Sequence, residues 1–88
     1  MKNILIVEDD RRLNDGIRLA LRNEFSCSQA FSLAEARQLW RTGMFDLILL
    51  DVNLPDGSGF DFCRYLGGHA RESGNVPVLF LTARDLEE

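Results

Sequence analysis

Residues 47–59 read LILLDVNLPDGSG, which is a run of four apolar residues, an aspartate and a series of turn-forming residues. A short, continuous apolar run bounded by turn signals is typical of a strand covered on both faces of a parallel sheet. Asp51 stands where that strand ends, and proline, aspartate and glycine after it favour a loop. The stretch therefore predicts a buried strand that delivers a carboxylate to its carboxyl end.

Further strands are predicted on either side of this stretch. Residues 4–7, ILIV, form a β-branched apolar run that is stopped by the acids Glu8, Asp9 and Asp10. Residues 76–81, VPVLFL, predict a last buried strand that runs into Thr82 and Ala83, and residues 25–30 have weaker strand character. Acids or small polar residues thus follow three of the four predicted strands.

Helical periodicity fills the intervals between the strands. Ser32 lies three residues before Glu35, a capping box that favours a helix from there to about Gly43. The other two helices are predicted from apolar residues that recur at helical spacing. These residues are Leu13, Ile17, Ala20 and Leu21 in the first helix and Phe60, Cys63 and Leu66 in the last.

Alternating strands and helices predict an α/β fold, a doubly wound parallel sheet with helices on both faces, because such crossovers are right-handed. A chain of 88 residues has room for one domain. The formal net charge of −4 argues against direct nucleic-acid binding. The apolar runs are too short to span a membrane and the N-terminus does not resemble a signal peptide, so we expect no membrane association and a cytoplasmic location.

The polar strand ends identify the region where chemistry is expected. In an open parallel sheet, ligands bind beyond the carboxyl ends of the strands. Carboxylates that converge there repel each other, and a hard divalent cation such as Mg2+ relieves that repulsion. Asp9 and Asp51, with a carbonyl near Asn53, offer an incomplete magnesium shell. Asp51 as nucleophile and Thr82 as hydroxyl donor would then suit phosphoryl transfer.

At these residues the sequence resembles the receiver domain of two-component response regulators. The resemblance rests on residues 4–10 (ILIVEDD), 49–59 (LLDVNLPDGSG) and 81–84 (LTAR), and the LPDGSG segment leans toward the branch of winged-helix transcription factors. It implies a flavodoxin-like fold with strand order 2-1-3-4. It also implies a signalling switch rather than an enzyme, phosphorylated by a sensor histidine kinase and linked to a DNA-binding output domain.

The resemblance also implies a role for each matching residue. Asp51 resembles the aspartate that receives the phosphoryl group, and Asp9 resembles a direct Mg2+ ligand. Glu8 would hold the metal through water, and Asn53 would offer its backbone carbonyl to the metal. Thr82 resembles the switch residue whose hydroxyl meets the phosphoryl group, and Ala83 resembles the neighbour whose amide helps to bind it.

The sequence departs from the family pattern after the fourth predicted strand. A complete receiver continues through a fifth strand, which carries a lysine, and two further helices, whereas residues 1–88 are expected to form a receiver domain truncated after the fourth strand. The only lysine is Lys2, at the opposite end of the first strand from the acids. An uncovered last strand exposes an edge and apolar faces, so we expect self-association through that edge.

Two alternatives stay open. The chain could be a truncated or engineered receiver that folds or oligomerises without productive switching. It could also be a phosphohydrolase of the haloacid dehalogenase type, which uses an aspartyl nucleophile in the pattern Asp-x-Asp. Asn53 stands where the second aspartate of that pattern is required, which weighs against the hydrolase.

Overall fold

The computed structural model describes residues 1–68 and 76–81. In this part of the chain, four parallel strands form the main sheet, namely β1 (Lys2–Val7), β2 (Phe25–Ala30), β3 (Leu47–Asp51) and β6 (Val78–Leu81). Their order is β2-β1-β3-β6. Since β6 is the fourth strand of this sheet along the chain, the predicted order 2-1-3-4 is confirmed.

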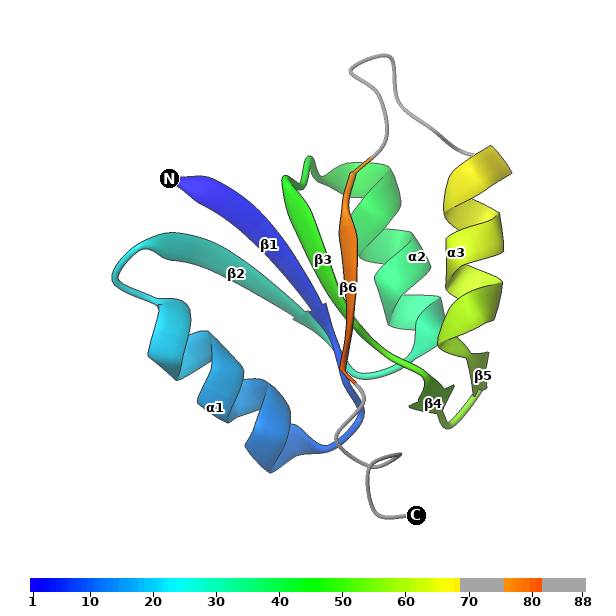
Figure 1. The fold of residues 1–88 in the computed structure, drawn as a ribbon, viewed down its shortest axis with the longest axis horizontal. Helices are drawn as coiled ribbons and strands as arrows, with labels where there is room; N and C mark the ends of the chain where they lie inside the picture. The colour runs from blue at the N-terminus through cyan, green and yellow to red at the C-terminus, as the bar shows by residue number, and fades with distance from the viewer. Residues whose placement is uncertain (69–75, 82–88) are drawn as a thin grey trace.

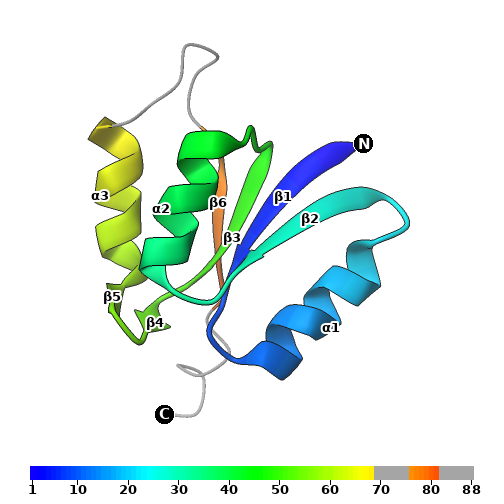
Figure 2. The same ribbon diagram turned by 180° about the vertical axis from the view of Figure 1, so that it is seen from behind.

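The helices cover both faces of the sheet, as Figures 1 and 2 show from opposite sides. Helix α1 (Arg11–Leu21) lies on one face, while α2 (Leu33–Thr42) and α3 (Gly59–Gly68) lie on the other. None of the described helices is long and apolar enough to cross a membrane. The buried hydrophobic cluster packs strand residues such as Leu5, Ile48 and Leu50 against Trp40 of α2 and Phe62 of α3. This core fixes β1 and β3 side by side and so places the residues at their carboxyl ends.

Each helix begins at a side chain that satisfies free backbone N–H groups. The Asp10 carboxylate caps α1 by accepting hydrogen bonds from the N–H groups of Arg12 (3.0 Å) and Leu13 (3.2 Å). The Ser32 hydroxyl caps α2 by accepting from the N–H of Glu35, as predicted. The Glu35 carboxylate accepts in return from the N–H of Phe31, one residue before the cap. These caps fix where the chain leaves β1 and β2.

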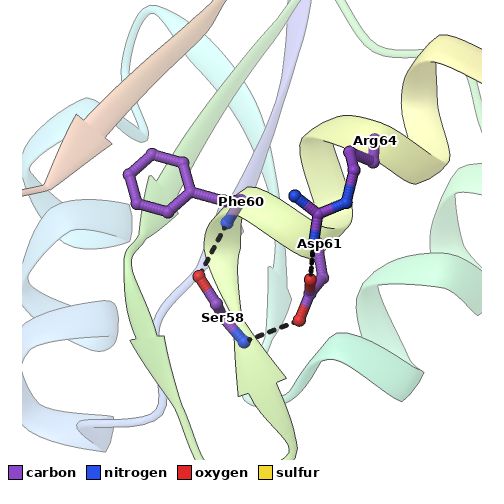
Figure 3. Close-up of polar contacts among 4 residues, drawn as sticks. All are labelled: Ser58, Phe60, Asp61 and Arg64. Atoms are coloured by element: carbon purple, nitrogen blue, oxygen red, sulfur yellow. Dashed lines mark hydrogen bonds and ion pairs between the residues drawn. The ribbon is translucent and has the colours of Figure 1, made fainter.

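Helix α3 begins with a capping box that the sequence analysis did not predict (Figure 3). The Ser58 hydroxyl accepts a hydrogen bond from the N–H of Phe60 (3.1 Å), and the Asp61 carboxylate accepts one from the N–H of Ser58 (3.2 Å). Arg64 forms an ion pair with the same carboxylate. This reciprocal arrangement stabilises the first turn of α3 where it leaves the β3 region.

The predicted loop after Asp51 contains a small hairpin. Strands β4 (Asn53–Leu54) and β5 (Gly57–Ser58) pair antiparallel across a turn at Pro55 and Asp56. Gly57 has a φ of +148°, a conformation that L-residues rarely adopt. The Asp56 carboxylate reaches α2 and accepts hydrogen bonds from the N–H groups of Leu33 (2.8 Å) and Ala34 (3.0 Å). The hairpin is therefore tied to the start of a neighbouring helix.

The last described strand is more exposed than the sequence pattern predicted. β6 begins at Val78 rather than Val76, and it is the outermost strand beside β3. Leu79 is 56% exposed and Phe80 is 36% exposed. Successive strand residues point to opposite faces of a sheet, so both faces of β6 present apolar surface. The prediction of a buried strand was wrong for Leu79 and Phe80, because pairing with β3 satisfies main-chain groups on one edge and does not cover side chains on the two faces of β6.

Candidate acidic site at the carboxyl edge of the sheet

Three carboxyl groups converge at the carboxyl ends of β1 and β3. One ligand oxygen from each of Glu8, Asp9 and Asp51 lies within 4.8 Å of the other two. The strand register accounts for this convergence, because Val7 pairs with Leu50 and the next residue along the chain from each is an acid, Glu8 just after β1 and Asp51 at the end of β3. Glu8 is 1% exposed and Asp51 is 4% exposed, while Asp9 is open to solvent. The predicted meeting of these three acids is confirmed.

The pKa of Glu8 is raised by its burial and by the neighbouring acids. Burial raises the pKa of Glu8 to about 7, against the opposing effect of the Asp10 N–H, which donates a 2.9 Å hydrogen bond to the Glu8 carboxylate. The negative charges of Asp51 and Asp9, and a hydrogen bond with the Asp9 side chain, raise this pKa further. Packing several carboxylates into a mostly buried site therefore costs free energy whenever all of them are ionised.

The donor set fits a hard divalent cation. All three side chains offer carboxylate oxygens, which Mg2+ prefers, and a bound cation would compensate the like charges that otherwise repel. Mg2+ needs only one or two protein carboxylates and keeps several waters. The exposed side of Asp9 leaves room for such waters beside the buried pair. These residues therefore form an acidic pocket of the kind that suits Mg2+.

The other predicted site residues do not belong to this cluster of three carboxyl groups. Asn53 lies two residues beyond Asp51, is exposed, and starts the small hairpin by pairing with Ser58. Thr82 and Ala83 follow β6 and lie outside the described residues. Lys2 begins β1, so it lies at the other end of that strand from Glu8. The roles predicted for Asn53, Thr82 and Ala83 remain predictions.

Two residues near the site were missed by sequence reasoning. Asn14 is fully buried in α1 and hydrogen-bonds to the main chain at the acids, and Asp56 ties the hairpin after Asp51 to α2. A signal for Asn14 was present, because it stands three residues before Ile17 and seven before Leu21, on the apolar stripe of α1. A polar side chain at such a position indicates a specific buried partner. Asp56 has no comparable signal, since aspartate is common in turns.

A family model for the response regulator receiver domain matches residues 4–88, nearly the whole chain. The chain belongs to this family. The acids at the ends of β1 and β3, the parallel sheet and its strand order are thus those of a receiver domain.

Relatives of this receiver domain include transcriptional regulators. It is 40% identical over 83 residues to the transcriptional regulatory protein BasR of Escherichia coli K12, covering 93% of this chain and 36% of BasR. It is 44% identical over 84 residues to the response regulator protein PmrA of Pseudomonas aeruginosa, again covering 93% of this chain and 36% of the relative. The chain therefore spans about a third of the length of these relatives.

Solved receiver domains have the same fold as this chain. The non-phosphorylated HemR receiver domain of Leptospira biflexa matches with a TM-score of 0.80 and 34% identity, over 91% of this chain and 63% of that receiver domain. The MaeR response regulator, solved bound to beryllium trifluoride, matches with a TM-score of 0.80 and 33% identity, over 92% of this chain and 66% of the solved MaeR chain. These likenesses confirm the predicted flavodoxin-like arrangement of strands and helices.

Proposed function

We propose that this receiver domain accepts a phosphoryl group on the Asp51 carboxylate from a phosphohistidine of a sensor histidine kinase. The observation that carries the proposal is the convergence of Glu8, Asp9 and Asp51 within 4.8 Å at the carboxyl edge of a receiver sheet. Among these acids, Asp51 combines near-complete burial with a position on β3, an inner strand of the sheet. A rigid strand end of this kind holds a nucleophile in a defined place.

The transfer needs a single exchange of bonds. An Asp51 carboxylate oxygen forms a bond to phosphorus while the P–N bond of phosphohistidine breaks, and the electron pair of that bond returns to the imidazole nitrogen. Most of the catalysis in such reactions comes from positioning and charge neutralisation. We assign the Thr82 hydroxyl and the Ala83 amide as donors to the phosphoryl oxygens.

Mg2+ would be held by Asp9 and Asp51 directly, by Glu8 through water and by the backbone carbonyl of Asn53. When bound, Mg2+ neutralises negative charge that would otherwise build up between the carboxylates and the phosphoryl oxygens. MaeR, with 33% identity to this chain, was solved with beryllium trifluoride bound, which supports an anion site in this fold. The cluster of oxygen donors in this chain supports the choice of metal.

The proposal places the domain in the control of transcription. Its relatives BasR and PmrA are regulatory proteins of which it covers about a third, so an output domain would lie in a longer protein. We assign that output to winged-helix DNA binding and the whole protein to the cytoplasm. The receiver itself acts as a signalling switch and not as a turnover enzyme, and its net charge of −4 is unsuited to DNA.

The exposed strand β6 favours a second role for the isolated chain. Leu79 and Phe80 present apolar surface on both faces of an edge strand, which is a template for pairing with another chain. We assign self-association of the isolated chain to this edge. A chain that uses β6 in this way could fold and assemble without switching.

Native mass spectrometry tests the phosphoryl acceptor. The 88-residue chain is incubated with Mg2+ and acetyl phosphate beside an Asp51→Asn variant. One phosphoryl adduct on the wild type and none on the variant is the expected result. An adduct of equal intensity on Asp51→Asn would overturn the assignment of Asp51. Release of many phosphates per chain, which Asp51→Asn abolishes, would instead favour a phosphohydrolase.

A further inference from the structure

Asn14 is a fully buried polar residue on the face of α1 that packs against the sheet. Its Nδ2 group donates hydrogen bonds to the carbonyl oxygens of Glu8 (2.9 Å) and Ala30 (3.2 Å). Its Oδ1 atom accepts a hydrogen bond from Nε2 of Gln29 (3.0 Å). An amide nitrogen has two hydrogens, so both are used, and the cost of burying this side chain is offset by hydrogen bonds.

These bonds hold the main chain of Glu8 from both sides. The N–H of Glu8 donates to the carbonyl oxygen of Ala30 (3.0 Å), and the carbonyl oxygen of Glu8 accepts from Asn14. The Glu8 carboxylate is held as well, because it accepts from the N–H of Asp10. The direction of the chain as it leaves β1 is therefore set by groups on β2, on α1 and in the loop itself.

Gln29 fixes which way the Asn14 amide faces. It lies on β2 and donates to Asn14 Oδ1 and also to the Asp15 carboxylate (2.7 Å). Because Gln29 supplies a donor, the oxygen of the Asn14 amide must face it, and the nitrogen must face the two carbonyl groups. The polar network thus extends from β2, through Asn14 of α1, to the main chain of Glu8.

We infer that Asn14 is a positioning residue for the acidic site. By holding the carbonyl of Glu8, it sets where the Glu8 and Asp9 carboxylates lie relative to Asp51. This inference rests on the proposed function, since it makes the Mg2+ site depend on α1. Residues that orient metal ligands commonly change metal affinity by roughly 10- to 100-fold when they are replaced.

The test measures Mg2+ affinity by titration calorimetry on the 88-residue chain. Asn14→Leu retains a side chain of similar size and removes both donors, and we expect the Kd for Mg2+ to rise at least about tenfold. Ala36→Gly is the matched control, because Ala36 is fully buried in α2 on the opposite face of the sheet. It should lower the thermal midpoint and leave the Kd unchanged. An unchanged Kd in folded Asn14→Leu would overturn the inference.

A second variant and a second readout keep the result decisive. Gln29→Ala removes the group that orients Asn14, and Gln29 is itself only half-buried. This variant therefore tests the same network if Asn14→Leu does not fold. Its Kd for Mg2+ should rise by a smaller factor. If the wild type binds no Mg2+, the proposed metal site fails by itself. Hydrogen exchange of the Asp10 amide without metal then decides the inference. Faster exchange of this amide in Asn14→Leu than in Ala36→Gly supports the inference. Equal exchange in the two variants overturns it.

Discussion

Gly59 packs directly on the backbone of Asp51, and a β-carbon at position 59 would overlap the carbonyl oxygen of Asp51. The N–H of Gly59 also donates a 2.7 Å hydrogen bond to the carbonyl oxygen of Val52. The start of α3 is therefore pressed against the end of β3, at the residue that we propose as the phosphoryl acceptor. Any side chain at position 59 would have to push these two elements apart.

We predict that Gly59→Ala lowers the free energy of unfolding by about 1–3 kcal/mol, the usual cost of overpacking a tight core. Gly16→Ala is the control, because Gly16 is exposed within α1 and has nothing within 4 Å of an added β-carbon. That change should raise the free energy of unfolding by up to about 1 kcal/mol through helix propensity. Urea denaturation of both variants checks the pair. Equal stabilities of Gly59→Ala and the wild type would contradict the close approach.

Asp9→Asn separates the metal site from the scaffold. Removing one negative charge beside Glu8 and Asp51 relieves repulsion, so at pH 8 without metal we expect the free energy of unfolding to rise by less than about 1 kcal/mol, the upper size of an exposed charge pair. The Kd for Mg2+ should increase at least about tenfold in the same variant. Denaturation in EDTA and calorimetric titration measure the two effects.

Asp10→Asn is the matched control for that experiment. It removes the same charge one residue further along, and asparagine caps a helix about as well as aspartate. We expect little change in the free energy of unfolding or in the Kd for Mg2+. A loss of stability in Asp9→Asn with unchanged Mg2+ affinity would contradict the acidic site.

The pH dependence of stability should report the contact between Asp56 and α2. Hydrogen bonds from the N–H groups of Leu33 and Ala34 hold the pKa of Asp56 below its usual value, against a smaller opposing effect of burial. A carboxyl group with a lowered pKa in the folded state stabilises the fold above its unfolded pKa of about 4. That stabilisation is lost as the pH falls through the folded pKa.

Asp56→Asn should therefore lower the free energy of unfolding at pH 7 by roughly 0.3–1 kcal/mol, because an amide has one acceptor oxygen for the two N–H groups and lacks the negative charge that a helix N-terminus favours. The difference from the wild type should shrink as the pH falls through the lowered pKa of Asp56 in the folded state, below which the wild-type carboxyl group is also neutral. Denaturant titrations at a series of pH values measure this. Glu24→Gln changes an exposed acid elsewhere and should give a difference that does not follow the same course. A difference independent of pH for Asp56→Asn would show that the charge has no role.

The sequence predicted those parts of the fold that depend on local patterns. The apolar runs located the strands, and the acid after each of β1 and β3 located the site, because parallel strands bring their carboxyl ends to one edge. Ser32 was likewise recognised as a helix cap from its spacing to Glu35. These features depend on neighbours in the chain or on a single rule of topology.

The features that were missed depend on packing between distant segments. Helical spacing placed Phe60 on the inner face of α3, yet Phe60 is 52% exposed and Phe62 is fully buried. The buried stripe of α3 starts at Gly59, whose contact with β3 sets the rotation of the helix, and Phe60 instead lies against Phe80 at 5.2 Å between ring centroids. The partners of Asn14 on β1 and β2 are equally invisible to a periodic pattern.

The exposed edge strand leads to a last prediction, on assembly of the isolated chain. Leu79 is 56% exposed on β6, whose outer edge has no strand partner among residues 1–68 and 76–81. We expect the weight-average mass in sedimentation equilibrium to rise with protein concentration, and Leu79→Lys to keep the chain monomeric, because a charged residue on an edge strand opposes pairing.

Leu19→Lys tests whether any exposed leucine would give the same result. Leu19 is 47% exposed on α1, away from β6, so its replacement should leave the concentration dependence unchanged. If both lysine variants reduce association equally, general apolar contact and not the strand edge drives it. If the wild type stays monomeric at the highest concentration, β6 does not pair with a second copy, and the self-association assigned to this edge is wrong.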